Sequence, residues 1–159
     1  MSFLNWLESL PLSVWVHESP SIWAQPTVMT LHTMGMGVLV GASWVLDLRL
    51  LGISRNIPLS AFRWVFPAVA ISLVVNLVTG LLLFMARAAL WGQAFPFLIK
   101  ILLVVASAAT LLPIRNYVLQ SDPEQRDVSS RAKMLAMISI ATWAAAITAG
   151  RLLAYTVAG

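Results

Sequence analysis

The sequence contains no cysteine and few charged residues. Without cysteine the chain can form no disulfide, iron–sulfur cluster, thiolate zinc site or cysteine nucleophile. Only 10% of its 159 residues are charged, whereas soluble domains contain about 25%. Apolar residues make up 60% of the chain, and its mean hydropathy is +0.87. Because a small soluble domain leaves much of its surface exposed, this composition excludes a soluble enzyme and a disordered chain.

The ten basic residues give a formal net charge of +4, but they form no basic cluster. They are scattered singly at the ends of apolar runs, and none precedes Arg49. A nucleic-acid-binding protein concentrates Lys and Arg on one face, so nucleic acid is excluded as a partner. The apolar runs are long and unbroken, unlike the alternating strands of a membrane β-barrel. The expected environment is therefore a lipid bilayer.

Four apolar stretches are long enough to cross a membrane. A hydrocarbon core of about 30 Å requires about 20 helical residues, and the stretches cover about 24–51, 62–85, 95–117 and 132–157. We therefore predict an all-α fold in which residues 1–159 form one four-helix transmembrane bundle.

The segment at about 1–23 differs from these spans. It opens with Ser2, a good helix cap, and is interrupted by Pro11. We predict that it forms a short amphipathic helix, or two such helices, lying in the membrane interface. Three tryptophans are expected to sit among the lipid headgroups: Trp6, Trp15 and Trp23.

The distribution of basic residues predicts the topology. Short loops rich in Lys and Arg face the cytoplasm. Here the N-terminal segment has no basic residue and the second loop has only Arg87. The first and third loops carry seven: Arg49, Arg55, Arg63, Arg115, Arg126, Arg131 and Lys133. We therefore expect a multi-pass protein of the bacterial inner (cytoplasmic) membrane, with both termini outside.

Ionisable residues inside the spans gather toward the outer side. His32 lies eight residues into the first span and Lys100 about one and a half turns into the third. Arg151 lies near the outer end of the fourth span, Arg87 just beyond the second, and His17 in the interfacial segment. Intramembrane ionisable groups are energetically costly and indicate function.

This combination predicts a haem b site. His32 is a suitable iron ligand, His17 is a candidate second axial ligand, and Arg87, Lys100 or Arg151 could pair with the propionates. The competing interpretations are a His32 that only bonds a neighbouring helix, a surface His17, and cations that snorkel to the headgroups. Small residues offer close approach to a macrocycle or a second helix: Gly35, Gly37 and Gly41 on the first span, and Thr79-Gly80 on the second.

Other polar residues support weaker hypotheses. Met29, His32 and Met36 share one helical face, and thioether with imidazole suits Cu(I). Asn76 is expected to hydrogen-bond between helices. Asp47, near the inner end of the first span, is expected to pair with an arginine: Arg49, Arg55 or Arg115. The sequence has no Ser-His-Asp set, no paired intramembrane carboxylates and no phosphate loop, which excludes hydrolases, kinases and ATPases.

Several motifs resemble an uncharacterised family of small bacterial four-span membrane proteins. They are His32-Thr-Met-Gly-Met-Gly37 with Asp47-Leu-Arg-Leu-Leu-Gly52, Thr79-Gly-Leu-Leu-Leu-Phe84, Phe97-Leu-Ile-Lys-Ile-Leu-Leu103, and Gly150-Arg-Leu-Leu-Ala-Tyr155. More distantly, the outer His and the Phe-x-x-Lys motif are similar to copper-resistance D proteins and HemJ-type membrane protoporphyrinogen oxidases. The HemJ-type resemblance implies a haem b with His32 and Lys100 important. This chain lacks the Tyr-His pair expected after the lysine and has Pro113-Ile-Arg-Asn116 instead, which argues against the oxidase activity.

The expected function is one-electron transfer at the outer leaflet, between quinol and an extracytoplasmic electron-transfer protein. The alternatives are a non-enzymatic accessory subunit, within a homo-oligomer or a larger membrane complex, and copper handling at Met29, His32 and Met36. The sequence leaves open whether the protein is an enzyme.

Overall fold

The prediction of an all-α fold with four long apolar helices is confirmed. The computed structural model describes residues 2–121 and 127–156, and these contain helices and no strand. The predicted loop residue Arg126 and the last residue of the predicted fourth span, Val157, lie outside this range. The long helices are α3 (Gln25–Leu51), α4 (Val65–Met85), α6 (Phe95–Gln120) and α7 (Ser130–Thr156). By length and composition, each can span a membrane.

Local sequence signals explain where these helices begin and end. α3 and α6 each have a proline in the first turn, where the missing N–H costs nothing. α3 ends at Gly52, whose φ of +104° is left-handed and suits glycine. α4 is preceded by a short 3₁₀-helix, η1 (Leu59–Phe62), which follows Pro58. Helix α6 continues through Pro113.

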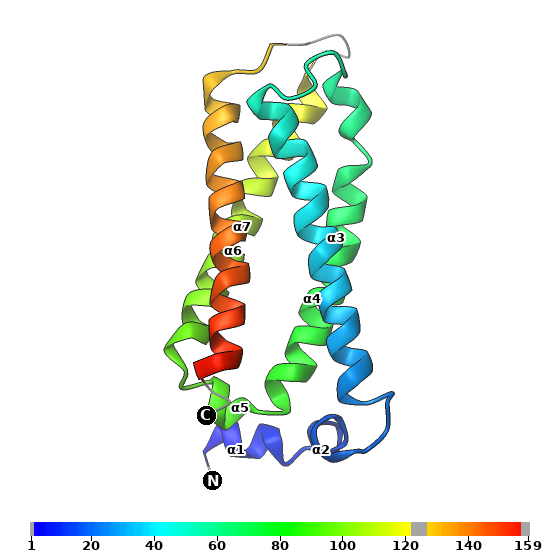
Figure 1. Cartoon of the computed structure of the whole chain (residues 1–159), viewed down its shortest axis with the longest axis vertical. Coiled ribbons are helices and arrows are strands. Elements are labelled where there is room, and N and C mark those ends of the chain that lie inside the picture. The colour runs from blue at the N-terminus through cyan, green and yellow to red at the C-terminus, as the bar shows by residue number, and fades with distance from the viewer. Residues whose placement is uncertain (1, 122–126, 157–159) are drawn as a thin grey trace.

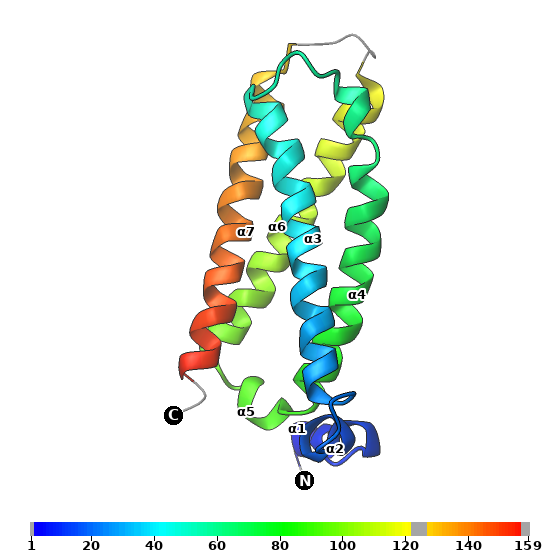
Figure 2. The same ribbon diagram turned by 45° about the vertical axis from the view of Figure 1, so that its right-hand side comes forward.

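The four long helices run roughly parallel as two hairpins (Figures 1 and 2). α3 packs along α4, and α6 packs along α7. Contact between the hairpins is mainly through α3 and α7. A site that needs residues from both hairpins must therefore lie beside the α3–α7 interface.

The two ends of the bundle differ. Three short helices cover what we call the terminal end: α1 (Phe3–Glu8), α2 (Pro11–Glu18) and α5 (Ala88–Trp91). α1 and α2 lie across this end, and α7 finishes there (Figure 1). Their tryptophans Trp6 and Trp15 are exposed, as is Trp23 in the following turn, as an interfacial segment requires. The opposite end, which we call the loop end, carries residues 52–58, 121 and 127–129.

The main apolar core belongs to the half of the bundle toward the loop end. On α3 its buried members begin at Leu39 and extend to Leu50, and on α6 they are Ile114 and Val118. On α7 they run from Ala132 to Ala146 and include Trp143, which is fully buried. The half toward the terminal end holds only smaller groups of buried apolar residues. The hairpins are therefore joined most tightly away from α1, α2 and α5.

Candidate functional site

His32 projects from α3 toward α4, where Thr79 fixes its ring. Nδ1 of His32 lies 3.0 Å from Oγ1 of Thr79. That hydroxyl donates its single hydrogen to the Val75 carbonyl at 2.6 Å, so it accepts from Nδ1–H. We therefore assign the tautomer in which Nε2 has no hydrogen. An Nε2 lone pair oriented by a bond from Nδ1 is the usual arrangement of a metal-binding histidine.

Glycines allow α3 and α4 to approach closely around this ring. A Cβ at Gly80 would lie 3.1 Å from Cε1 of His32, and a Cβ at Gly35 would lie 2.6 Å from Nδ2 of Asn76. The expectation of close approach is therefore correct for Gly35 and Gly80. It is wrong for Gly37 and Gly41, because a Cβ at either would meet no atom of the described residues within 4 Å. These two glycines face away from the bundle.

Asn76 does not bond across the helices as expected. Its Nδ2 donates to the Ser72 carbonyl of its own helix at 3.0 Å. Its Oδ1 is buried and finds no hydrogen-bond donor in the described part of the chain. The side chain therefore presents an unused acceptor beside Gly35, one turn of α4 from the residue that holds His32.

Lys100 approaches the same region from the other hairpin. Its aliphatic chain lies over Gly150 of α7, where a Cβ would be 3.5–3.7 Å from Cε, Cδ and Nζ. Lys100 is half-buried, and its charge interacts with His32. Among the described residues no carboxylate pairs with it. The structure thus brings the imidazole of His32 near the amine of Lys100, although the two residues are 68 positions apart in the sequence.

The remaining predicted ligands are not gathered around His32. His17 and Arg151 are exposed, and Arg87 is half-buried at the start of α5. Within the described residues, none of the three bonds to His32 or Lys100. Met29 is 53% exposed, whereas Met36 packs against the core. The described residues contain no group of three or more His, Asp or Glu placed to hold a metal.

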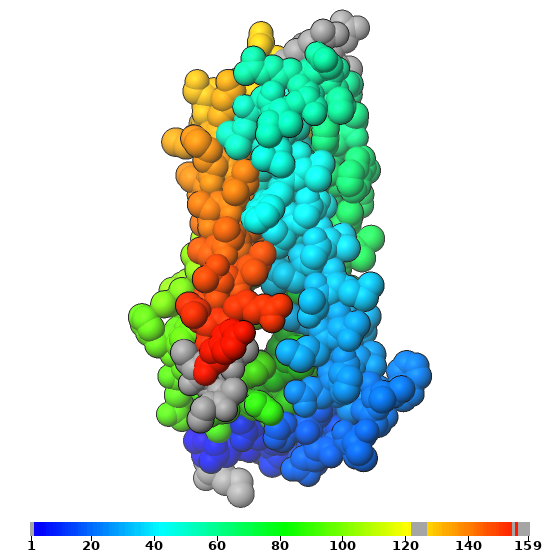
Figure 3. Space-filling model, in the orientation of Figure 1, coloured from blue at the N-terminus to red at the C-terminus, as the bar shows by residue number. Residues whose placement is uncertain are grey.

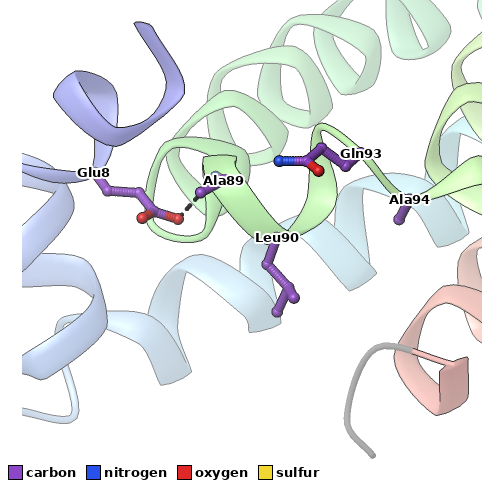
Figure 4. A pocket seen from close by; sticks show the side chains of 5 residues that line it. All are labelled: Glu8, Ala89, Leu90, Gln93 and Ala94. Carbon is purple, nitrogen blue, oxygen red and sulfur yellow. Dashed lines mark hydrogen bonds between the residues drawn. The ribbon is translucent and has the colours of Figure 1, made fainter. Parts of the chain in front are cut away.

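Near the terminal end, the bundle is open on one side and covered at its end. Figure 3 shows an opening between α7 and α3 near the terminal end. At the end itself, α1 packs on α5 and α2 on α4. Glu8 of α1 accepts a 2.9 Å hydrogen bond from the Ala89 amide of α5 (Figure 4). This contact fixes the N-terminal segment beneath the bundle.

Comparison with known proteins adds no relative. The chain matches no protein-family model, no curated protein and no solved structure. The resemblance to copper-resistance D proteins and HemJ-type oxidases therefore stays a prediction. The structural basis for a function is therefore the geometry of His32, Thr79, Asn76 and Lys100.

Proposed function

We propose that this protein binds haem b in the membrane near its terminal end, with His32 as axial ligand, and transfers single electrons there. The observation that carries the proposal is that His32 of one hairpin and Lys100 of the other lie near enough for their charges to interact. Both lie in the half of the bundle that lacks the main apolar core.

The residues present fit such a group in three respects. Nε2 of His32 is free to bind iron, because Thr79 occupies Nδ1. Lys100 provides a half-buried cation for a propionate. The unpaired Oδ1 of Asn76 offers an acceptor to a polar group of the ligand. Bound haem b would supply the one-electron chemistry, and its potential would depend on the axial ligand and on the exclusion of water.

The surroundings suggest the electron-transfer partners. The opening between α3 and α7 lies on a side of the bundle that would face lipid (Figure 3), so we expect a quinol, which is soluble in lipid, as donor. If the terminal end is extracytoplasmic, as the basic residues predict, the acceptor would be an extracytoplasmic protein of the bacterial inner membrane system. Copper handling is less favoured, because Met29 points away from the bundle while Met36 packs into it.

The absorbance spectrum of protein purified from haem-replete cells tests the proposal. We expect a Soret band that His32→Ala abolishes. His17→Ala is the matched control, since it removes the other histidine of the chain. It should retain the pigment, with a change from low to high spin if His17 is the sixth ligand. Absence of a Soret band, or a band that survives in His32→Ala, would overturn the proposal, and metal analysis would then test copper.

A further inference from the structure

A second buried polar cluster lies between α3 and α7 in the half toward the loop end. Its members are Asp47 of α3 and Ser139 of α7, each no more than 1% exposed. Ser139 is the polar neighbour of the Asp47 carboxyl group. The cluster is separate from His32, which is 15 positions from Asp47 on the same helix.

The polar atoms of this cluster are poorly satisfied. Oδ2 of Asp47 and Oγ of Ser139 are both buried, and neither has a hydrogen bond of good geometry within the described residues. Buried polar atoms are nearly always bonded, and in a bilayer the surroundings supply no water to replace a missing partner. Two such atoms on neighbouring residues indicate that the site holds something other than side chains.

The expected pairing of Asp47 with an arginine is wrong. Arg49 is itself buried, but it points into the loop: Nε donates to the Ile57 carbonyl at 2.7 Å and Nη2 to the Arg55 carbonyl at 3.3 Å. The charged and titratable groups on the neighbouring elements cluster toward the loop end: Arg55, Arg63, Arg115, Tyr117, Arg131 and Lys133. In the described part of the chain, none of them forms an ion pair with Asp47.

This environment selects among the possible occupants. An ionised carboxylate without a counter-ion is very costly inside a protein, whereas a neutral carboxylic acid is tolerated. A metal cation needs several oxygen ligands, and the cluster offers side-chain oxygens only from Asp47 and Ser139. A proton satisfies both conditions, since it neutralises the carboxyl group and creates a donor for a neighbouring oxygen.

We propose that Asp47 and Ser139 form a proton-binding site within the membrane, in which Asp47 holds an exchangeable proton as the neutral acid. Ser139 then bonds the carboxyl group directly or through one enclosed water. Intramembrane carboxylic acids of this kind act as proton relays in pumps and transporters. Asp47 lies four residues from the end of α3, so the site exchanges protons with the face at the loop end. The proposal does not depend on haem at His32.

Infrared difference spectroscopy on the full chain in lipid vesicles tests this site. Raising the pH from acidic to alkaline should remove a carbonyl stretching band of a protonated carboxylic acid that is absent from Asp47→Asn. Asp127→Asn, in the exposed loop, is the matched control and should retain the band. The proposal is overturned if wild-type and Asp47→Asn spectra show the same carboxylic-acid bands at every pH.

Ser139→Ala provides a second test, which remains valid even if the Asp47→Asn variant folds poorly. Removal of the hydroxyl leaves the acid with one hydrogen-bonding neighbour fewer, so its carbonyl band should move to higher wavenumber. A band at the wild-type position would exclude Ser139 from the site. Both measurements can be made on haem-free protein, so their failure is distinguishable from failure of the haem proposal.

Discussion

The two halves of the bundle are made from the same four helices, but they are packed differently. Toward the loop end, large apolar side chains such as Leu46, Leu50 and Trp143 are fully buried between the hairpins. Toward the terminal end, the half-buried polar side chains of His32 and Lys100 lie within the two hairpins instead, and an opening separates α3 from α7 (Figure 3). Because α3 runs through both halves, the hydropathy of this helix alone does not reveal that the two halves are packed differently.

This difference separates the residues that hold the fold together from those available for a ligand. Close-packed interiors stabilise by dispersion and leave no space for another molecule. The terminal end instead combines an open side, an oriented imidazole and an unpaired amine, which are features of binding sites. The buried Asp47 cluster shows that the packed half also carries polar chemistry, but on the scale of a proton or a water.

The largest effect is expected from labelling the two ends. A charged maleimide cannot cross a bilayer, and a helix of 26 residues separates the ends by about 39 Å. Because the chain has no cysteine, single cysteines at two exposed positions report cleanly. Ser2→Cys should label in intact spheroplasts, and Asn56→Cys only after permeabilisation. The reverse pattern would invert the topology and place His32 near the cytoplasm.

A large difference is also expected between two leucines of α3. Leu46 is 1% exposed in the packed half, and Leu31 is 47% exposed in the other half. Leu46→Ala should lower the free energy of unfolding by about 2–5 kcal/mol, because it leaves a cavity. Leu31→Ala should change it by no more than about 0.5 kcal/mol. Reversible unfolding in mixed micelles measures both, and equal losses would show that the halves are equally packed.

The fold was largely predictable from sequence because run length and helix signals are local. Four unbroken apolar runs exceed the bilayer thickness, and Gly52 ends α3 as its conformation allows. The 3₁₀-turn before α4 was not predicted, since it depends on how Pro58 and Leu59 pack against the bundle. Depth along each helix also placed His32 and Lys100 at the same end.

The orientation of individual side chains was less predictable. Asp47 and Arg49 are two residues apart, so they point about 200° from each other around α3, which explains why the expected ion pair is absent. Gly35 and Gly37 differ in the same way, and only the structure shows which one faces α4. The role of Thr79 was missed because its bond to His32 joins residues 47 positions apart. From the sequence alone, Thr79-Gly80 is distinguished only by the small size of its side chains.

Two alanine substitutions on α3 sharpen the contrast between inward and outward faces. Gly35→Ala places a Cβ 2.6 Å from Nδ2 of Asn76, so we expect a loss of about 1–3 kcal/mol from overpacking. Gly37→Ala meets only open space among the described residues. It should be neutral or stabilise by up to about 1 kcal/mol, because alanine favours the helix. The same unfolding assay compares them, and equal effects would contradict the assigned facing of α3.

A substitution at Thr79 is expected to cost less than Leu46→Ala or Gly35→Ala, but it tests the site most directly. Thr79→Val keeps the shape and removes the hydroxyl that accepts from Nδ1 of His32. Loss of one such bond should cost about 0.5–1.5 kcal/mol.

A more informative measurement is the nitrogen chemical shifts of the two imidazole rings in ¹⁵N-labelled protein. In the wild type, His32 should carry its hydrogen on Nδ1, and in Thr79→Val the two tautomers should mix. Exposed His17 serves as the internal control, and Thr33→Val, which removes an outward-facing hydroxyl of α3, should leave His32 unchanged. A His32 that keeps its hydrogen on Nδ1 in Thr79→Val would show that Thr79 does not set the tautomer.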